Sequence, residues 1–295
     1  MTRKKATDFH PKLLELYDGY AHGQLTKREF LRQAAHYTAV GVTAAAVLQS
    51  MRPNYALAQQ VAEDDPSIET MIAEYESPEG HGTIRGLMAK PAGANGPLPA
   101  VLVIHENRGL NPYIEDVVRR TAKAGYLAFG PDGLTPLGGY PGNDDDGRAM
   151  QQTLDGAKLM EDFFAAFEFL RDHEGSTGKV GAVGFCYGGG VCNALAVAYP
   201  EMAASVPFYG RQPEAAQVPS IQAPLLLHYG GLDERVNAGW PAYEEALQAN
   251  GKAYEAHIYE GANHGFHNDS TPRYDEAAAT LAWDRTLAHF AANLA

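Results

Sequence analysis

The chain has 295 residues, of which 45% are hydrophobic and 20% charged, with 31 glycines. This composition is typical of a turn-rich globular protein with enough apolar material for a sheet buried on both faces. The formal net charge is −13. It is unevenly distributed, since the first 58 residues are basic and residues 59–295 carry about −17. So acidic a body disfavours nucleic acid or an anionic membrane as a partner.

Residues 1–58 differ from the rest of the chain. Apolar side chains at positions 13, 14, 17 and 20 recur at helical spacing and predict a short amphipathic helix. A basic stretch around Lys27-Arg28, the apolar run 39–48 and the segment Ala56-Leu57-Ala58 follow. This order is the pattern of an export signal, and the pair followed by Phe30-Leu31 resembles a twin-arginine signal with Lys in place of the first Arg.

Export would place the protein in the periplasm or outside the cell, and otherwise we expect it in the cytoplasm. The alternative is that residues 1–58 form an uncleaved helical arm, which packs on the body or on a second subunit of a homodimer. The apolar run is too short to span a bilayer comfortably, so a stable membrane anchor is not expected.

The remaining sequence alternates between strand-like and helix-like segments after a linker and first strand region at residues 59–83. We expect strands at residues 84–89, 100–104, 126–129, 179–183, 204–208, 224–229 and 254–259, and helices at 113–124, 151–171, 187–198, 238–248 and 274–290. The Gly-rich and Pro-rich loop 130–146 is predicted at the rim of a site. Residues 84–295 are therefore predicted to form one α/β domain, a mostly parallel sheet with helices on both faces.

A tight strand-to-helix turn is predicted at Gly184-Phe185-Cys186-Tyr187-Gly188. Small residues on both sides of a strained nucleophile allow its backbone to turn sharply, so this segment reads as a nucleophile elbow with Cys in place of Ser. The first amides of the following helix would point at the sulfur and favour its thiolate. A tight turn around a buried thiol is the competing interpretation.

Two further residues favour the nucleophile interpretation. Asp233 follows the predicted strand 224–229, and His264 follows the last predicted strand, so both lie at the same strand ends as Cys186. Nucleophile, acid and histidine come in the order of the α/β-hydrolase fold. We therefore predict that Cys186 attacks an acyl carbon, His264 transfers the proton and Asp233 orients the imidazole. The oxyanion would bind the backbone N–H groups of Tyr187 and Asn107.

At these residues the chain resembles the dienelactone hydrolase (carboxymethylenebutenolidase) family, over about residues 84–290. The resemblance implies that Glu106 pairs with the nucleophilic cysteine and governs its activation. The alternative is that Glu106 is a loop carboxylate that caps the following helix. The family's archetype has an arginine four residues after the catalytic histidine, where it binds the substrate carboxylate, and this chain has Asn268. Arginines 108, 211 and 273 are the available substitutes, and the sequence does not choose among them.

The other polar residues receive simpler interpretations. Cys192 falls on the apolar stripe of the helix after the elbow and is predicted to be a core residue. His264, with His267 and His257 nearby, does not suggest a metal site of fitting geometry, so neither a metal nor a cofactor is expected. Tyr113, Tyr209 and Arg211 are candidates for the substrate pocket. The acidic run 144–146 is predicted to be a solvated loop.

The leading hypothesis is hydrolysis of a small ester or lactone through a thioester on Cys186. One alternative is a non-catalytic binding module, since a fold does not fix a function. The other is an acyl transferase, or an enzyme that cleaves a different bond such as a phosphotriester. Activity on model esters with Cys186→Ala as a control would separate the first two hypotheses.

Overall fold

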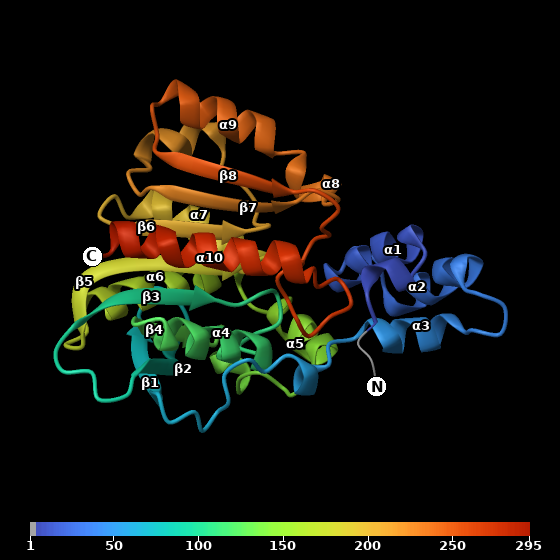
Figure 1. The fold of residues 1–295 in the computed structure, drawn as a ribbon, viewed down its shortest axis with the longest axis horizontal. Helices are drawn as coiled ribbons and strands as arrows, with labels where there is room; N and C mark the ends of the chain where they lie inside the picture. Colours follow the sequence, from blue (N-terminus) through green and yellow to red (C-terminus); the bar gives the residue numbers. More distant parts are fainter. Residues whose placement is uncertain (1–3) are drawn as a thin grey trace.

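The computed structural model describes residues 4–295, and residues 1–3 of the predicted arm lie outside this range. The described chain forms a sheet of eight strands with helices on both faces (Figure 1). The strands are β1 (Ile68–Ser77), β2 (Gly82–Pro91), β3 (Leu98–Ile104), β4 (Leu127–Pro131), β5 (Ser176–Phe185), β6 (Ala204–Phe208), β7 (Leu225–Gly230) and β8 (Tyr254–Tyr259).

The strand order in the sheet is β1-β2-β4-β3-β5-β6-β7-β8. The pairs from β4 through β3 to β8 are parallel, whereas β1 pairs with β2 and β2 with β4 in the antiparallel sense. The predicted mostly parallel α/β sheet is confirmed. In a parallel sheet all carboxyl ends lie at one edge, so the loops after β3, β5, β7 and β8 meet there.

The helices of the body pack on both faces of this sheet. They are α4 (Pro112–Lys123), α5 (Asp144–Gln151), α6 (Gly156–Asp172), α7 (Tyr187–Ala198), α8 (Glu234–Asn237), α9 (Trp240–Ala249) and α10 (Glu276–Asn293), with short 3-10 turns η4 (Thr135–Leu137) and η5 (Ala215–Ser220). On one face, α6, α7 and α9 share a core with Leu102 of β3. On the other, α4 and α10 share a core with Val101 and Val103, the alternation that a strand buried on both faces requires.

The acidic segment differs from its prediction. The helix expected at 151–171 begins later, as α6 at Gly156, because Asp155 accepts the N–H groups of Ala157 and Lys158, and Gln151 is the last residue of α5. Residues 144–146 are the first turn of α5 and not a solvated loop, since Asn143 caps this helix and acidic residues are favoured at a helix N-terminus. The Asp144 carboxylate also accepts a hydrogen bond from Arg108, whose side chain is buried.

The N-terminal arm, which we define as residues 4–58, is helical and lies beside one end of the sheet (Figure 1). It contains η1 (Ala6–Asp8), α1 (Pro11–Ala21), α2 (Lys27–Ala34), η2 (Ala35–Tyr37), α3 (Ala44–Met51) and η3 (Tyr55–Leu57). These helices bury their own small apolar cluster, in which the Phe30 side chain is fully enclosed. No helix within residues 4–295 combines the length and the apolar character needed to cross a membrane.

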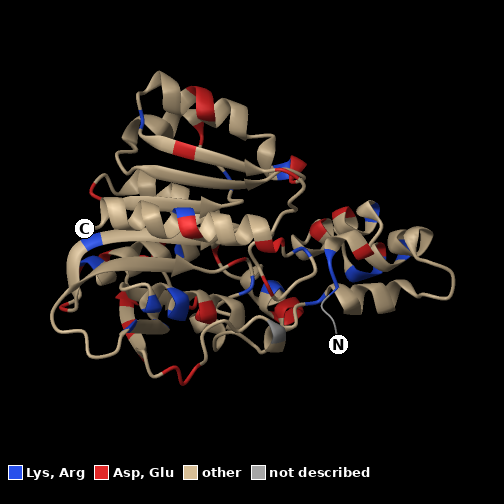
Figure 2. Cartoon of the chain, viewed as in Figure 1, with Lys and Arg blue, Asp and Glu red and all other residues tan. Residues whose placement is uncertain are grey.

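Polar contacts join the arm to the body of the same chain, where charged side chains gather (Figure 2). Tyr20 donates a hydrogen bond of 2.7 Å to Asp145 of α5, and Arg52 pairs with the same carboxylate. Beyond the arm, the N–H of Val61 donates to Asp116 of α4 at 2.8 Å. The arm thus packs on its own body, and its predicted contact with a second subunit stays a prediction.

Candidate active site

The turn between β5 and α7 places Cys186 in a strained conformation. Its φ of 55° and ψ of −109° lie in a region that residues with a Cβ rarely adopt. Glycine is needed on both sides, because a Cβ on Gly184 would lie 2.1 Å from the Gly188 carbonyl oxygen and one on Gly188 would lie 2.3 Å from that of Ile104. This backbone geometry is that of a nucleophile elbow, with the sulfur at the start of a helix.

The predicted acid and histidine lie together at the neighbouring strand ends. Asp233 follows β7 and caps α8, and His264 follows β8, with its Nδ1 2.5 Å from Asp233 Oδ2. Burial is the largest effect and would raise the pKa of Asp233, but the hydrogen bond and the charge of His264, together with the N–H of Val236, lower that pKa overall. An ionised carboxylate only accepts hydrogen bonds, so Nδ1 of His264 carries a proton and Nε2 faces the sulfur side of the site.

A second histidine, which the sequence did not bring forward, lies between these groups. His22 follows α1 of the arm, and its Nε2 is 3.2 Å from Cys186 Sγ and also 3.2 Å from His264 Nε2. The two imidazole rings meet edge to face with their centroids 4.6 Å apart. His22 therefore stands where an acyl group attacked by Cys186 would have to bind.

An aspartate of the arm orients His22 as Asp233 orients His264. Nδ1 of His22 is 2.7 Å from the backbone carbonyl of Asp18 and 3.3 Å from its carboxylate. Burial opposes the charged form of His22, yet the neighbouring Cys186 and Asp18 together raise its pKa. Asp18 in turn accepts a hydrogen bond of 2.9 Å from Arg273 and lies 3.4 Å from Arg235. Two His–Asp pairs thus flank one sulfur.

The arm covers the nucleophile. Cys186 is 7% exposed and His264 is 5% exposed, and the Asn107 side chain donates to the Ala21 carbonyl at 2.9 Å, just before His22. An open groove of about 740 Å³ lies between the first turn of the arm and the start of α10, but Cys186 does not line it. In this conformation the arm therefore covers the sulfur.

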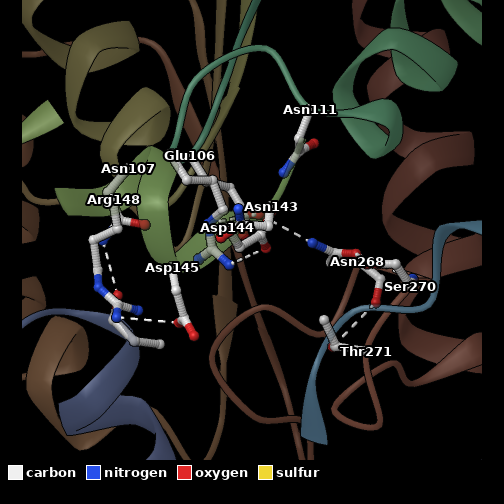
Figure 3. A network of polar contacts seen from close by, with 12 residues as sticks. Glu106, Asn107, Asn111, Asn143, Asp144, Asp145, Arg148, Asn268, Ser270 and Thr271 are labelled. Carbon is white, nitrogen blue, oxygen red and sulfur yellow. Dashed lines mark hydrogen bonds and ion pairs between the residues drawn. The ribbon is translucent and has the colours of Figure 1, made fainter. Parts of the chain in front are cut away.

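Glu106 is buried in the loop after β3, as its predicted role requires, but its contacts differ from that role. It accepts a hydrogen bond of 3.0 Å from Asn268 (Figure 3) and lies 3.7 Å from Arg108. Within residues 4–295, no hydrogen bond joins Glu106 to Cys186, whose sulfur contacts His22. Asn268, at the position where the family's archetype has an arginine, thus fixes Glu106 with a neutral amide.

The predicted oxyanion-hole residues lie on the two expected elements. Tyr187 is the first residue of α7, and the first amides of a helix have no partner within it. Asn107 lies in the loop after β3, and its side chain already bonds to the arm.

The three predicted pocket residues have different surroundings. Tyr209 is buried with a φ of 39°, and its ring centroid lies 4.9 Å from that of His264, so it borders the site. The Tyr113 hydroxyl is 2.7 Å from His267 Nδ1. Arg211 is exposed, and its backbone carbonyl accepts a hydrogen bond from Asn193. Arg235, which the sequence did not single out, lies 3.1 Å from His22 and 3.4 Å from His264, whereas Arg273 pairs with Asp18.

Cys192 and the two histidines considered with His264, His257 and His267, have other surroundings. Cys192 is fully buried in the core, and burial raises its pKa well above the ordinary value, as expected of an inert thiol. His257 lies 2.8 Å from the carboxylate of Glu255 and His267 bonds to Tyr113, so neither approaches His264.

A strained turn after a central parallel strand, with an acid and a histidine at the next strand ends, defines an α/β-hydrolase. The dienelactone hydrolase family model matches residues 84–294, and a YqhI-like family model matches residues 1–39. The chain therefore belongs to the dienelactone hydrolase family, and it is a hydrolase that acts on esters or lactones.

Individual relatives agree with this assignment. The chain is 60% identical to the "Putative hydrolase fragment YghX" of Escherichia coli over 39% of this chain and 97% of that one. It is 30% identical to a "Putative carboxymethylenebutenolidase" of Methylorubrum extorquens over 81% of this chain and 89% of the relative. The crystal structure of a "Putative Dienelactone Hydrolase" from Klebsiella pneumoniae superposes with a TM-score of 0.66 at 27% identity, covering 76% of this chain and 99% of that one.

Proposed function

We propose that the protein hydrolyses a small carboxylic ester or lactone through a thioester on Cys186. The observation that carries the proposal is the pair formed by His264 Nδ1 and Asp233, 2.5 Å apart, beside a cysteine held at a strained elbow. A carboxylate that fixes the imidazole tautomer leaves Nε2 free to exchange a proton with the nucleophile and the leaving group.

The reaction has two steps with balanced proton transfers. His264 takes the thiol proton of Cys186, Sγ bonds to the acyl carbon, the C–O bond to the leaving group breaks, and His264 passes that proton to the departing oxygen. A water then gives a proton to His264 and attacks the thioester, which releases the acid and restores the thiol. The backbone N–H of Tyr187 and that of Asn107 would stabilise the oxyanion in both steps.

Withdrawal of His22 precedes this cycle in our proposal. The imidazole of the arm lies 3.2 Å from both the sulfur and the base, so acyl binding needs that space. Because Asn107 bonds to Ala21 of the arm, the same movement would free the loop that carries the second oxyanion donor. The resting state is therefore covered, and the reactive state is open.

Trapping the acyl-enzyme tests the proposal. The full chain is mixed with p-nitrophenyl esters and enol-lactones, quenched in acid and weighed by intact mass spectrometry. We expect an adduct of one acyl group on Cys186, and a fall in turnover of at least about 1,000-fold in Cys186→Ala. Cys192→Ala is the matched control, which should keep both the adduct and the turnover.

Other outcomes identify the competing functions. Turnover that survives Cys186→Ala would rule out the sulfur as nucleophile. A wild-type chain that forms an adduct but passes the acyl group to an added alcohol in preference to water would be an acyl transferase. Complete inactivity on every ester and lactone, in a chain with an alkylatable Cys186, would favour the binding module.

A further inference from the structure

Three atoms that bind transition metals converge where the arm meets the body. They are Nε2 of His22, Sγ of Cys186 and Nε2 of His264, and all lie within 4.8 Å of one another. Each comes from a different part of the chain, namely the end of α1, the elbow before α7 and the loop after β8. Two imidazole nitrogens and one thiolate are a ligand set that suits Zn²⁺.

Both histidines are already oriented for coordination through Nε2. His264 Nδ1 bonds to the Asp233 carboxylate, and His22 Nδ1 bonds to the Asp18 carbonyl, so each Nδ1 carries its proton. A metal-bound imidazole almost always donates its second N–H to a carboxylate or a carbonyl in this way. The two Nε2 lone pairs and the sulfur then face one another and need a shared cation or proton between them.

The separations fit a tetrahedral ion. With bonds of about 2.0–2.1 Å to nitrogen and about 2.3 Å to sulfur, tetrahedral ligands lie roughly 3.3–3.6 Å apart. His22 Nε2 is 3.2 Å from both other ligand atoms, so two of the three edges lie within about 0.4 Å of these separations. Small side-chain rotations would close the third edge and leave the fourth position to water.

The surrounding charges decide whether a dication is tolerated. The carboxylates of Asp18 and Asp233 bring negative charge to the site, and the sulfur of Cys186 would add to it once a metal displaces its proton. Arg235 opposes it, because its guanidinium lies 3.1 Å from His22 Nε2. This side chain is 38% exposed and already reaches the Asp18 carboxylate, so it can rotate away without losing every partner.

We propose that His22, Cys186 and His264 form a site for one Zn²⁺-class ion, which ties the arm to the nucleophile. Binding replaces the thiol proton of Cys186 by the metal and consumes the Nε2 lone pairs of both histidines. A coordinated sulfur cannot attack an acyl carbon, and a coordinated His22 holds the arm over the site. The sequence prediction of no metal weighed only histidines 257, 264 and 267, since nothing local linked His22 to Cys186.

Cobalt binding tests the site directly. The metal-free full chain is titrated with Co²⁺ and followed by thiolate-to-cobalt absorption in the near ultraviolet and by four-coordinate bands in the visible. We expect one Co²⁺ per chain, displaced by Zn²⁺. The absorption should vanish in Cys186→Ser and persist in Cys192→Ser.

Zn²⁺ affinity, measured against a chromophoric chelator, tests the arm's part. Replacing a residue that only hydrogen-bonds to a metal ligand weakens metal binding about 10–100-fold. Because His22 is proposed as a ligand itself, His22→Ala should weaken Zn²⁺ binding at least about 100-fold. His36→Ala, an exposed histidine of the same arm, should bind as the wild type does. His22→Gln, together with circular dichroism of each variant, shows that the loss is not unfolding. Equal affinity of His22→Ala and wild type, or a wild type without the thiolate band, would overturn the proposal.

The inhibitory consequence rests on the proposed hydrolase. Zn²⁺ should abolish ester turnover by the wild type and a chelator should restore it, while His22→Ala should need at least about 100-fold more Zn²⁺. The metal-binding measurements use no substrate. A cobalt band in a chain that cleaves no ester would therefore contradict the proposed function alone, and turnover without metal binding would contradict the metal site alone.

Discussion

The arm and the catalytic body differ in the interactions that stabilise them. The body buries a central parallel sheet between two apolar layers, and its elbow, Asp233 and His264 are built into strand ends. The arm has only a small apolar cluster of its own and reaches the site through polar side chains such as Asp18, Tyr20 and Arg52. The body therefore supplies the strained turn, the acid and one histidine, whereas the arm supplies a second histidine that is held to the body by polar contacts.

The largest expected effect on activity concerns the body. Gly188→Ala would place a Cβ 2.3 Å from the Ile104 carbonyl, between two main chains that cannot both shift. We expect a loss of about 2–4 kcal/mol in the free energy of unfolding and a near-complete loss of ester turnover. Urea unfolding and a p-nitrophenyl ester assay measure the two.

Gly190→Ala, in the same helix, is the matched control. Its Cβ would meet nothing closer than 3.6 Å, so stability and turnover should change little. Equal behaviour of the two variants would show that the elbow is not as tightly packed as described.

The arm should unfold in a variant whose body stays folded. Phe30 is fully enclosed in the arm's cluster, and its replacement by alanine should remove about 3–5 kcal/mol of packing there. We expect faster alkylation of Cys186 and earlier proteolysis before residue 59, with the main unfolding transition of the body kept. A body that melts together with the arm would contradict the separation of the two regions.

A single charge should loosen the arm more gently. Asp18→Asn weakens the pairing with Arg273, a buried cation, and removes a carboxylate that orients His22. Because Asp18 remains 21% exposed, we expect a cost of about 1–2 kcal/mol and a rise of roughly 10-fold in the rate of Cys186 alkylation. Asp8→Asn, on the same arm, changes a carboxylate that accepts the N–H of Lys5, and it should leave this rate unchanged.

The smallest effect is a pH dependence that belongs to the body. Burial holds the pKa of His228 well below its ordinary value. Below pH about 6.5 the imidazole of residue 228 is protonated in the unfolded chain but stays neutral in the folded chain. The free energy of unfolding therefore falls as the pH falls. From pH 7 to 5.5 we expect a loss of about 1 kcal/mol in the free energy of unfolding from this residue.

Urea unfolding at both pH values measures this loss. His228→Gln should reduce the difference between them, whereas His36→Gln on the exposed arm should not. An equal pH difference in all three proteins would remove His228 as its source.

The elements of the body were largely predictable because their signals are local. The bounds predicted for α7, β6 and β8 match the structure, since apolar runs and periodicity lie within each segment. The predicted places of Cys186, Asp233 and His264 also follow from strand ends. Their chemical roles stay a prediction.

The contacts of the arm could not be read in this way. His22 lies 164 residues from Cys186, and only the spacing of Asp18 and His22 on one helical turn hinted at a pair. The fate of the acidic run 144–146 likewise depended on the distant Arg108, and the partner of Glu106 on Asn268. Packing between remote segments decides these positions, and no local pattern carries it.

Asp18 neutralises a small group of positive charges on a molecule whose body is otherwise acidic. Residues 59–295 carry about −17, yet the carboxylate of the arm rests on the guanidinium groups of Arg273 and Arg235. If the arm moved away, both arginines would lose this counter-ion. The entrance to the site would then become locally positive, although the negative charge of the body repels anions elsewhere. Small anions would then be drawn to the entrance, more strongly in dilute salt than in concentrated salt.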